Sequence, residues 1–374
     1  MFTFHHFSQL NDLEDSVGLR ISFIVCSNGF GHFKRVLGVA QALIEVDKNC
    51  TITIFCANKH IDLISNLQPN FRISSDKNIR FNKSISRFEI NFLKIKKGSY
   101  SKYQKWLQVI SSNKKLIDSD LIVSDNHIAP LNVFNNVILM GSFIWHDLKK
   151  SSVIDYKMIV SLEKRILNTN KPQILCLRSM AMHNLSKNTN PVFAPWFTEK
   201  HECRFSKKNS SVLITGGGTS LFDDILIQLS NCLLNLDDKL VIHLDSKLFD
   251  KYSFPKERVK LFSFKDEDFG KLKAIICRPG IGILTDCVKY NIPVIAVNDN
   301  SNLEISSNAL NVERLKLGIL INIKKSNYLN TSIQIITLLN NNSALENFRM
   351  SIEKQECYGS SFAANYLLSQ CTKL

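Results

Sequence analysis

Two glycine-containing stretches hold the side chains that are best placed to do chemistry. In the first, residues 27–35 (SNGFGHFKR), His32 follows Gly29 and Gly31 and comes directly before an apolar helical pattern. The dipole of a helix disfavours positive charge at its start, so an imidazole at this point is expected in its neutral form. A neutral imidazole can accept a proton from an attacking hydroxyl group. We interpret His32 as a general base, and the alternative is a His that only hydrogen-bonds the loop.

The second stretch covers residues 274–309 and combines a strand, a glycine turn at residues 278–282, a helix at residues 284–290, another strand and a polar loop. Glycines let a backbone approach a ligand closely, and the free N–H groups of a helix start can hold a phosphate. Asp286, expected in the first helical turn, would face a ribose diol, and Glu304 in the polar loop would reach another hydroxyl-bearing group. This pattern predicts a nucleotide-sugar site. The alternative is an ordinary strand-to-helix turn with a capping acid.

A third glycine run strengthens this prediction. Gly216, Gly217 and Gly218 are followed by Thr219 and a helical pattern, and three glycines before a helix start are typical of an anion-binding turn. The turns at residues 216–218 and 280–282 could converge on one diphosphate. Because the sequence has no suitably placed pair of acids for a metal, we expect no metal site and no required cofactor, and backbone amides would hold the diphosphate.

These residues need a scaffold, and short apolar runs alternate with helical patterns along most of the chain. A helix with Val36, Val39 and Leu43 on one face separates the first two runs. Right-handed crossovers join such parallel strands, so the alternation predicts an α/β fold with doubly wound sheets. Strands are expected at residues 20–26, 51–57, 121–124, 137–140, 174–177, 211–215, 240–245, 259–262, 274–277, 294–297 and 318–323.

The length of 374 residues suits two domains, each able to bury its own core. Pro191, Pro195 and the charged stretch that ends at Lys208 are typical of a linker. We expect a division into an N-terminal extension, two Rossmann-like domains that face a cleft, and a C-terminal helix. The corresponding ranges are residues 1–19, 20–200, 209–350 and 351–374.

Two further features of the first half leave alternatives open. Asp125 and His127 follow the strand at residues 121–124, where the carboxyl ends of parallel strands line a cleft. They are second-choice acid or base candidates, although a satisfied turn is slightly favoured. The helix at residues 101–110 carries Tyr103 and Trp106 on one face beside lysines, which suits an anionic membrane surface. Packing of this face on its own domain is the favoured alternative.

The net charge of +14 is uneven, because residues 1–206 hold 27 Lys and Arg against 16 Asp and Glu. A basic half can attract nucleic acid, anionic lipid or a phosphorylated substrate, although a general bias toward Lys and Asn explains the charge equally well. The ten cysteines form no CxxC pair, which predicts reduced, buried thiols and no zinc site in a cytoplasmic protein. No apolar run approaches the roughly 20 residues of a membrane span, and the N-terminus lacks the pattern of a signal peptide.

The motifs together resemble those of GT-B glycosyltransferases, most closely the family of the membrane-associated N-acetylglucosaminyltransferase of peptidoglycan synthesis. Their donor segment has the pattern R-x-G, an acid, G-x-P, and an E/Q pair before N-A. Here the matching positions are Arg278, Gly280, Asp286, Pro293, Glu304, Asn308 and Ala309. Asp286 replaces the usual Glu, Asn291 replaces the Gly of G-x-P, and Ile305 stands where the second Gln would be.

The first glycine stretch resembles the GxGHxxR turn of these transferases and of related nucleotide-sugar hydrolases, with Gly29, Gly31, His32 and Arg35 at the matching positions. The resemblance implies an acceptor-binding first domain, a donor-binding second domain and a final helix that crosses back to the first. It implies donor contacts from Arg278, Gly280, Asp286, Glu304 and Asn308, to which the glycine run described above adds Gly217, Gly218 and Thr219.

The expected activity is inverting transfer of a sugar from a nucleotide-diphosphate sugar to an acceptor hydroxyl. A glycan or lipid-linked acceptor of cell-envelope or surface glycan synthesis is in keeping with the resemblance, as is peripheral contact with an anionic membrane at its inner, cytoplasmic face. Two alternatives remain. One is a nucleotide-sugar hydrolase or epimerase on the same fold. The other is a basic protein that binds nucleic acid or a membrane surface, although no nucleic-acid partner is expected.

Overall fold

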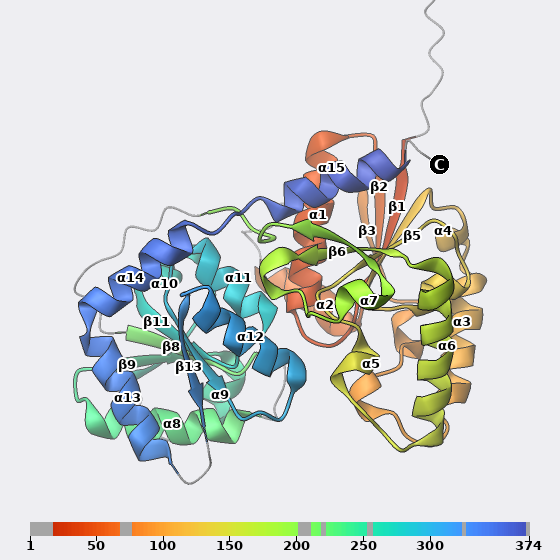
Figure 1. Cartoon of the computed structure of the whole chain (residues 1–374). Helices are drawn as coiled ribbons and strands as arrows, with labels where there is room; N and C mark the ends of the chain where they lie inside the picture. The colour runs from red at the N-terminus through yellow and green to blue at the C-terminus, as the bar shows by residue number, and fades with distance from the viewer. Residues whose placement is uncertain are drawn as a thin grey trace, which may run out of the picture.

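The computed structural model describes residues 18–67, 77–200, 211–217, 222–252, 257–323 and 327–371, with the side chains of residues 63–67 left aside. Within these ranges the chain forms two parallel β-sheets, each flanked by helices, that lie next to each other (Figure 1). The predicted α/β fold with two doubly wound sheets is confirmed.

The first sheet has seven strands in the order β3-β2-β1-β4-β5-β6-β7, and every pair of neighbours is parallel. Its strands are β1 (Arg20–Ile24), β2 (Thr51–Phe55), β3 (Ile79–Asn82), β4 (Leu121–Asp125), β5 (Val137–Met140), β6 (Gln173–Leu177) and β7 (Asn190–Ala194). The helices that connect them are α1 (Gly31–Val46), α2 (Asn58–Leu67), α3 (Ser99–Ser111), α4 (Lys114–Ile117), α5 (Trp145–Leu148), α6 (Ile154–Asn170) and α7 (Leu185–Asn188). Short 3-10 helices are η2 (Ser86–Phe88), η3 (Phe92–Lys94), η4 (Ala129–Asn132) and η5 (Arg178–Met180).

The second sheet has six parallel strands in the order β10-β9-β8-β11-β12-β13. Its strands are β8 (Ser211–Thr215), β9 (Val241–Leu244), β10 (Val259–Leu261), β11 (Leu272–Cys277), β12 (Val294–Asn298) and β13 (Gly318–Asn322). Its helices are α8 (Asp223–Leu236), α9 (Ser246–Lys251), α10 (Asp266–Phe269), α11 (Ile281–Lys289), α12 (Leu303–Arg314), α13 (Tyr328–Asn340) and α14 (Asn342–Glu353). The last helix, α15 (Gly359–Cys371), packs against α1 and β7 of the first sheet's half (Figure 1).

The strand order in each sheet reverses once, and this determines where a ligand can bind. The chain moves outward from β1 to β3 and then returns to place β4 beside β1. In the same way, β11 returns beside β8. Loops that leave two such neighbouring strands diverge and open a crevice at the carboxyl ends of the strands. The fold therefore offers two ligand-binding points, one between β1 and β4 and the other between β8 and β11.

The strands are apolar because helices cover both faces of each sheet. In β1, Phe23 belongs to the cluster of buried side chains that also includes α1, whereas Ile24 belongs to the cluster on the opposite face, which includes α3 and α6. The first cluster continues into the second half of the chain, where it includes Leu213 of β8 and Leu284 of α11. The two halves thus share one core.

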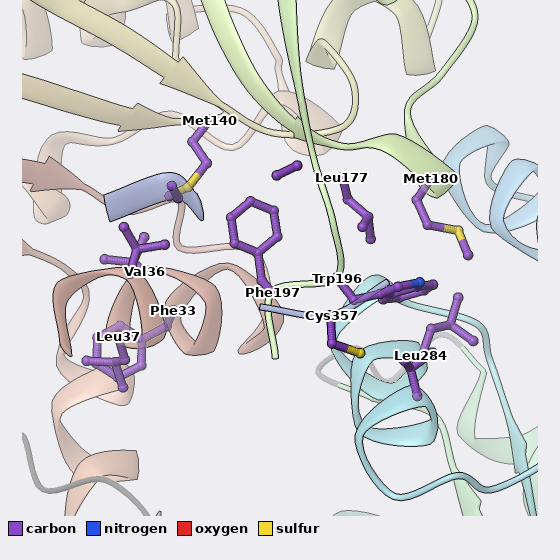
Figure 2. Packing of buried hydrophobic residues seen from close by; sticks show 14 of the residues in the cluster. Phe33, Val36, Leu37, Met140, Leu177, Met180, Trp196, Phe197, Leu284 and Cys357 are labelled. Atoms are coloured by element: carbon purple, nitrogen blue, oxygen red, sulfur yellow. The ribbon is translucent and has the colours of Figure 1, made fainter. Parts of the chain in front are cut away.

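The segments around Trp196 and Gly359 complete this shared core. Trp196 is buried in the cluster and lies near Leu284 (Figure 2). Its backbone N–H donates to Glu356 O at 3.0 Å, and Gly359 N–H donates to Trp196 O at 2.8 Å. These bonds tie the chain that leaves the first half to the chain that returns to it.

One prediction about the first half was wrong. The segment at Pro191 is not all linker, because β7 follows β6 as the last strand of the sheet. Proline is tolerated there because β7 is an edge strand, where a missing N–H interrupts no further pairing. The favoured interpretation of the aromatic face of α3 is confirmed, since Tyr103 and Trp106 are buried against their own domain. Among the described residues, no helix is long and apolar enough to cross a membrane.

Gly359→Ala should loosen the attachment of α15. A Cβ atom at this position would lie 2.4 Å from Pro195 O and 2.7 Å from Trp196 O, so backbone must move. Overpacking of this kind costs about 1–3 kcal/mol, and we expect a lower midpoint of urea unfolding. Gly270→Ala is the matched control, because its Cβ would make only an ordinary contact with Glu267 O at 3.8 Å. Equal midpoints for the two variants would contradict the packing described here.

Candidate functional site

The first ligand-binding point brings His32 and Asp125 together. His32 lies in the first turn of α1, after β1, and Asp125 is the last residue of β4. The His32 Nδ1 atom is 2.8 Å from Asp125 Oδ1. A carboxylate can only accept, so Nδ1 carries the proton, and it is Nε2 that has the lone pair in the neutral form of the ring. The side chain of His32 is 14% exposed and that of Asp125 is fully buried, so the imidazole is the member of the pair that a substrate can reach.

Arg35 completes this group of charges. Its Nη2 atom donates to Asp125 Oδ1 at 2.8 Å, and its guanidinium lies 5.8 Å from the centre of the Phe197 ring. Burial alone would raise the pKa of Asp125, but Arg35 and His32 hold it below its usual value. Asp125 therefore stays ionised and orients His32, which differs from the prediction of an independent acid or base. Arg35 was likewise expected to belong to the acceptor loop, but in the structure it is buried in an ion pair with Asp125.

The glycine loop before His32 is fastened from below by His60, a residue that sequence reasoning did not single out. Gly29 has φ of +86°, which favours glycine. Its carbonyl oxygen lies 3.2 Å from His60 Nε2, and the His60 ring stacks on Phe33 with centroids 4.8 Å apart. Burial, helped by the neighbouring Lys59, lowers the pKa of His60 to about 4. His60 is thus a neutral donor that holds the loop.

The second ligand-binding point carries the glycine turns. Thr215 and Cys277 pair at the ends of β8 and β11, and Arg278 N–H donates to Thr215 O at 3.2 Å. The turns that begin at Gly216 and Arg278 therefore start side by side, as predicted for a shared anion site. Gly217 has φ of +69° and Gly280 caps α11. Gly218 and Thr219 lie outside the described residues.

Asn308 supports the second turn from behind. It lies in α12, is 2% exposed, and its Nδ2 donates to Pro279 O at 3.0 Å. This hydrogen bond fixes the turn that leads to Gly280. Asn308 therefore positions the glycine turn, whereas the family resemblance implied a direct contact with the donor.

The two ligand-binding points meet at a contact between backbones. A Cβ atom on Gly282, in the first turn of α11, would lie 2.9 Å from Gly31 Cα, and a Cβ on Gly31 would lie 3.1 Å from Gly282 N. Only glycine at both positions allows this approach. The starts of α1 and α11 therefore face each other across the junction of the two halves, and His32 lies beside the glycine turn of the other half.

The predicted helix at residues 284–290 begins earlier, and this changes the place of Asp286. Because Gly280 caps α11 and the helix starts at Ile281, Asp286 lies in the second turn and not the first. Its Oδ2 atom is 3.0 Å from Lys34 Nζ of α1. The carboxylate expected to face a ribose diol is paired with a lysine from the opposite half. Lys34 stands within the first glycine stretch, but the spacing of that stretch gave no sign of its partner.

Glu304 also lies in a helix and not in the predicted polar loop. Asn302 caps α12 by accepting from Ile305 N at 3.2 Å, so Glu304 falls in the first helical turn. Burial raises the pKa of Glu304, while the positive charges of His32 and Arg278 act in the opposite direction. Glu304 thus lies within electrostatic reach of residues from both halves. Burial lowers the pKa of Arg278, and Glu304 opposes this effect.

His127 is enclosed away from this group. Its side chain is 1% exposed, and its ring lies edge-on to Trp106 with centroids 4.9 Å apart. The Nε2 atom is 3.2 Å from Glu89 Oε1. His127 therefore does not join His32 at the junction, unlike its near neighbour Asp125.

No protein-family profile and no curated protein sequence matches the chain. Solved structures do match over nearly its whole length. The glycotransferase of kitacinnamycin has a TM-score of 0.63 at 11% identity, with 95% of this chain and 99% of that chain covered. Phytolacca americana UGT2 has a TM-score of 0.62 at 11% identity, with 95% and 99% covered. MurG of Acinetobacter baumannii has a TM-score of 0.58 at 12% identity, with 94% and 99% covered. The chain shares the GT-B fold of these proteins, as its motifs predicted.

The pH dependence of stability tests the placement of His60. Because its pKa is about 4 in the folded chain and about 6.5 when unfolded, only the unfolded state binds a proton between these values. Folding stability should therefore fall as the pH is lowered from about 6.5 to 4, by up to roughly 3 kcal/mol. His60→Phe should flatten this dependence in urea unfolding, whereas His183→Ala, at an exposed position, should not. An unchanged slope in His60→Phe would contradict a buried neutral imidazole.

Proposed function

We propose that the chain is an inverting glycosyltransferase that moves a sugar from a nucleoside diphosphate sugar to an acceptor hydroxyl. The observation that carries the proposal is the meeting of Gly31 and Gly282, which brings a His–Asp pair and a phosphate-binding type of turn to one junction. Transfer needs a base and a diphosphate site that are separated by about the width of one sugar ring, because the reacting atoms must be held in line.

In the proposed reaction, the acceptor oxygen attacks C1 of the donor sugar. The new bond forms on the face opposite the diphosphate, so the configuration at C1 inverts. His32 Nε2 takes the proton of the acceptor hydroxyl, and the electron pair of the breaking C1–O bond goes to the departing phosphate oxygen. Asp125 keeps the proton on Nδ1 and stabilises the imidazolium that forms.

Backbone N–H groups would hold the diphosphate. The start of α11 and the turn at Gly217 lie at the ends of adjacent strands, and helix starts stabilise negative charge that grows on a leaving group. Arg278 would add a positive charge, and Glu304 would bind sugar or ribose hydroxyls. Asp286 would bind the ribose once Lys34 has released it. The set requires no metal ion.

The ligands of one structural neighbour are in keeping with this proposal. Phytolacca americana UGT2 was solved in complex with UDP-2fluoro-glucose and pterostilbene. At 11% identity this likeness establishes the fold alone, so the chemistry of the junction residues must support the activity.

His32→Ala should lower the rate of transfer by about 10²- to 10⁴-fold, which is the usual contribution of a general base. The affinity for the nucleoside diphosphate should change little, because the glycine turns would bind it. The measurement is single-turnover transfer from a panel of nucleotide sugars, with isothermal titration of the matching diphosphate as the binding control. Full activity in His32→Ala would overturn the proposed role.

Incubation of the wild-type chain with donor alone separates transfer from hydrolysis. A transferase should leave most of the donor intact until an acceptor hydroxyl is added. Rapid and complete loss of donor without an acceptor would instead establish water as the nucleophile, and the chain would then be a hydrolase.

Lys34→Met should strengthen binding of a nucleoside diphosphate by up to about fivefold. The substitution frees Asp286, and a partly exposed ion pair of this kind is worth at most about 1 kcal/mol. A 2′,3′-dideoxynucleoside diphosphate lacks the diol and should bind both proteins equally. If the substitution improves both ligands alike, Asp286 does not contact the ribose.

A further inference from the structure

We propose that Cys26, Glu89 and His127 form a binding site for a zinc-like divalent metal ion beneath the loop that leads to His32. The three side chains come from three separate segments, and their ligand atoms all lie within 4.8 Å of one another. Sulfur, imidazole nitrogen and carboxylate oxygen are the donors that zinc accepts in proteins. The separation of the ligands along the chain explains why no cysteine spacing predicted the site.

His127 gives the first independent argument for an ion. Its side chain is 1% exposed, and within the described part of the chain neither ring nitrogen makes a hydrogen bond. Nε2 lies 3.2 Å from Glu89 Oε1 but is not aligned for a hydrogen bond with it. A buried polar group without a partner costs free energy. A metal ion between the imidazole and the carboxylate would give Nε2 the partner that it lacks.

Glu89 is held as a metal-ligating carboxylate usually is. Ser27 donates twice to Oε1, from its backbone N at 3.0 Å and from its Oγ at 2.9 Å. The same N–H also reaches Oε2 at 3.2 Å. Such outer hydrogen bonds fix the orientation of a ligand and are regular features of metal sites. Oε2 keeps lone pairs for an ion.

The charges of the group also fit a divalent ion. Cys26 is a free and fully buried cysteine, and binding would replace its thiol proton with the metal and release that proton to solvent. One thiolate and one carboxylate then neutralise the two positive charges of the ion, so no net charge is buried. With three protein ligands, a tetrahedral ion keeps one position for water or for Ser27 Oγ.

The place of the site suggests what an ion would do. Cys26 and Ser27 open the loop that runs to His32, and His127 stands two residues after Asp125. An ion would therefore fasten the loop of the base to the segment of its orienting carboxylate. The three ligands would thus be residues that position His32 and Asp125. The proposal of a metal site does not depend on whether the chain transfers a sugar.

Cobalt(II) titration of the metal-free full-length chain tests the proposal. We expect one equivalent of Co²⁺ to bind, with the absorption of a tetrahedral ion and a thiolate-to-cobalt charge-transfer band, and with displacement by one equivalent of Zn²⁺. The charge-transfer band should disappear in Cys26→Ser and remain in Cys56→Ser. Cys56 is a matched control, because it is also a fully buried free cysteine just after a strand of the same sheet.

The wild-type spectrum decides the question even if the variants do not fold. Binding of less than about a tenth of an equivalent, or a Co²⁺ spectrum without a thiolate band, would overturn the proposal. A band that persists in folded Cys26→Ser would also overturn it. His127→Gln should reduce the affinity for Zn²⁺ by 10-fold or more while the chain stays folded, and an unchanged affinity would remove His127 from the site.

Discussion

The backbone contact between Gly31 and Gly282 determines how closely the two halves of the chain can approach. Each glycine lies in the first turn of a helix, α1 or α11, that leaves the central region of its sheet. Because no side chain lies between the two glycines, the N–H groups at the start of α11 and the imidazole at the start of α1 can contact the same ligand. With any larger residue at either position, His32 and the glycine turn at Gly280 would lie farther apart.

Charge distribution at the junction follows from this approach. Asp125 is fully buried, and its ionised state depends on Arg35 and His32 from α1. Glu304 from the second half lies within the electrostatic influence of the same histidine and of Arg278. The ion pair between Lys34 and Asp286 crosses the junction of the two halves. In the proposed reaction, a nucleotide that bound Asp286 would have to replace this ion pair with its own contacts.

Local patterns predicted the alternation of strands and helices and the place of the glycine turns, because continuous apolar runs and glycine-led helix starts are local signals. The edge strand β7 was missed because Pro191 suggests a linker. A proline is tolerated in this strand because β7 lies at the edge of the sheet, and the sequence does not show the order of the strands. Asp286 was expected in the first helical turn and Glu304 in a loop, whereas the caps by Gly280 and Asn302 place them in the second turn of α11 and the first turn of α12. His32 was predicted to be a base, yet its pairing with Asp125, 93 residues away, depends on the β1–β4 crossover and has no local signature.

The central claim is that one ligand contacts both glycine-led helix starts, and amide hydrogen exchange with and without a nucleoside diphosphate tests it most directly. The account predicts slower exchange in peptides covering residues 27–35 and in those covering residues 278–286. Both effects should rise with ligand concentration along the same binding curve. Protection of only one segment by a ligand that demonstrably binds, or two different binding curves, would contradict a shared site at the junction.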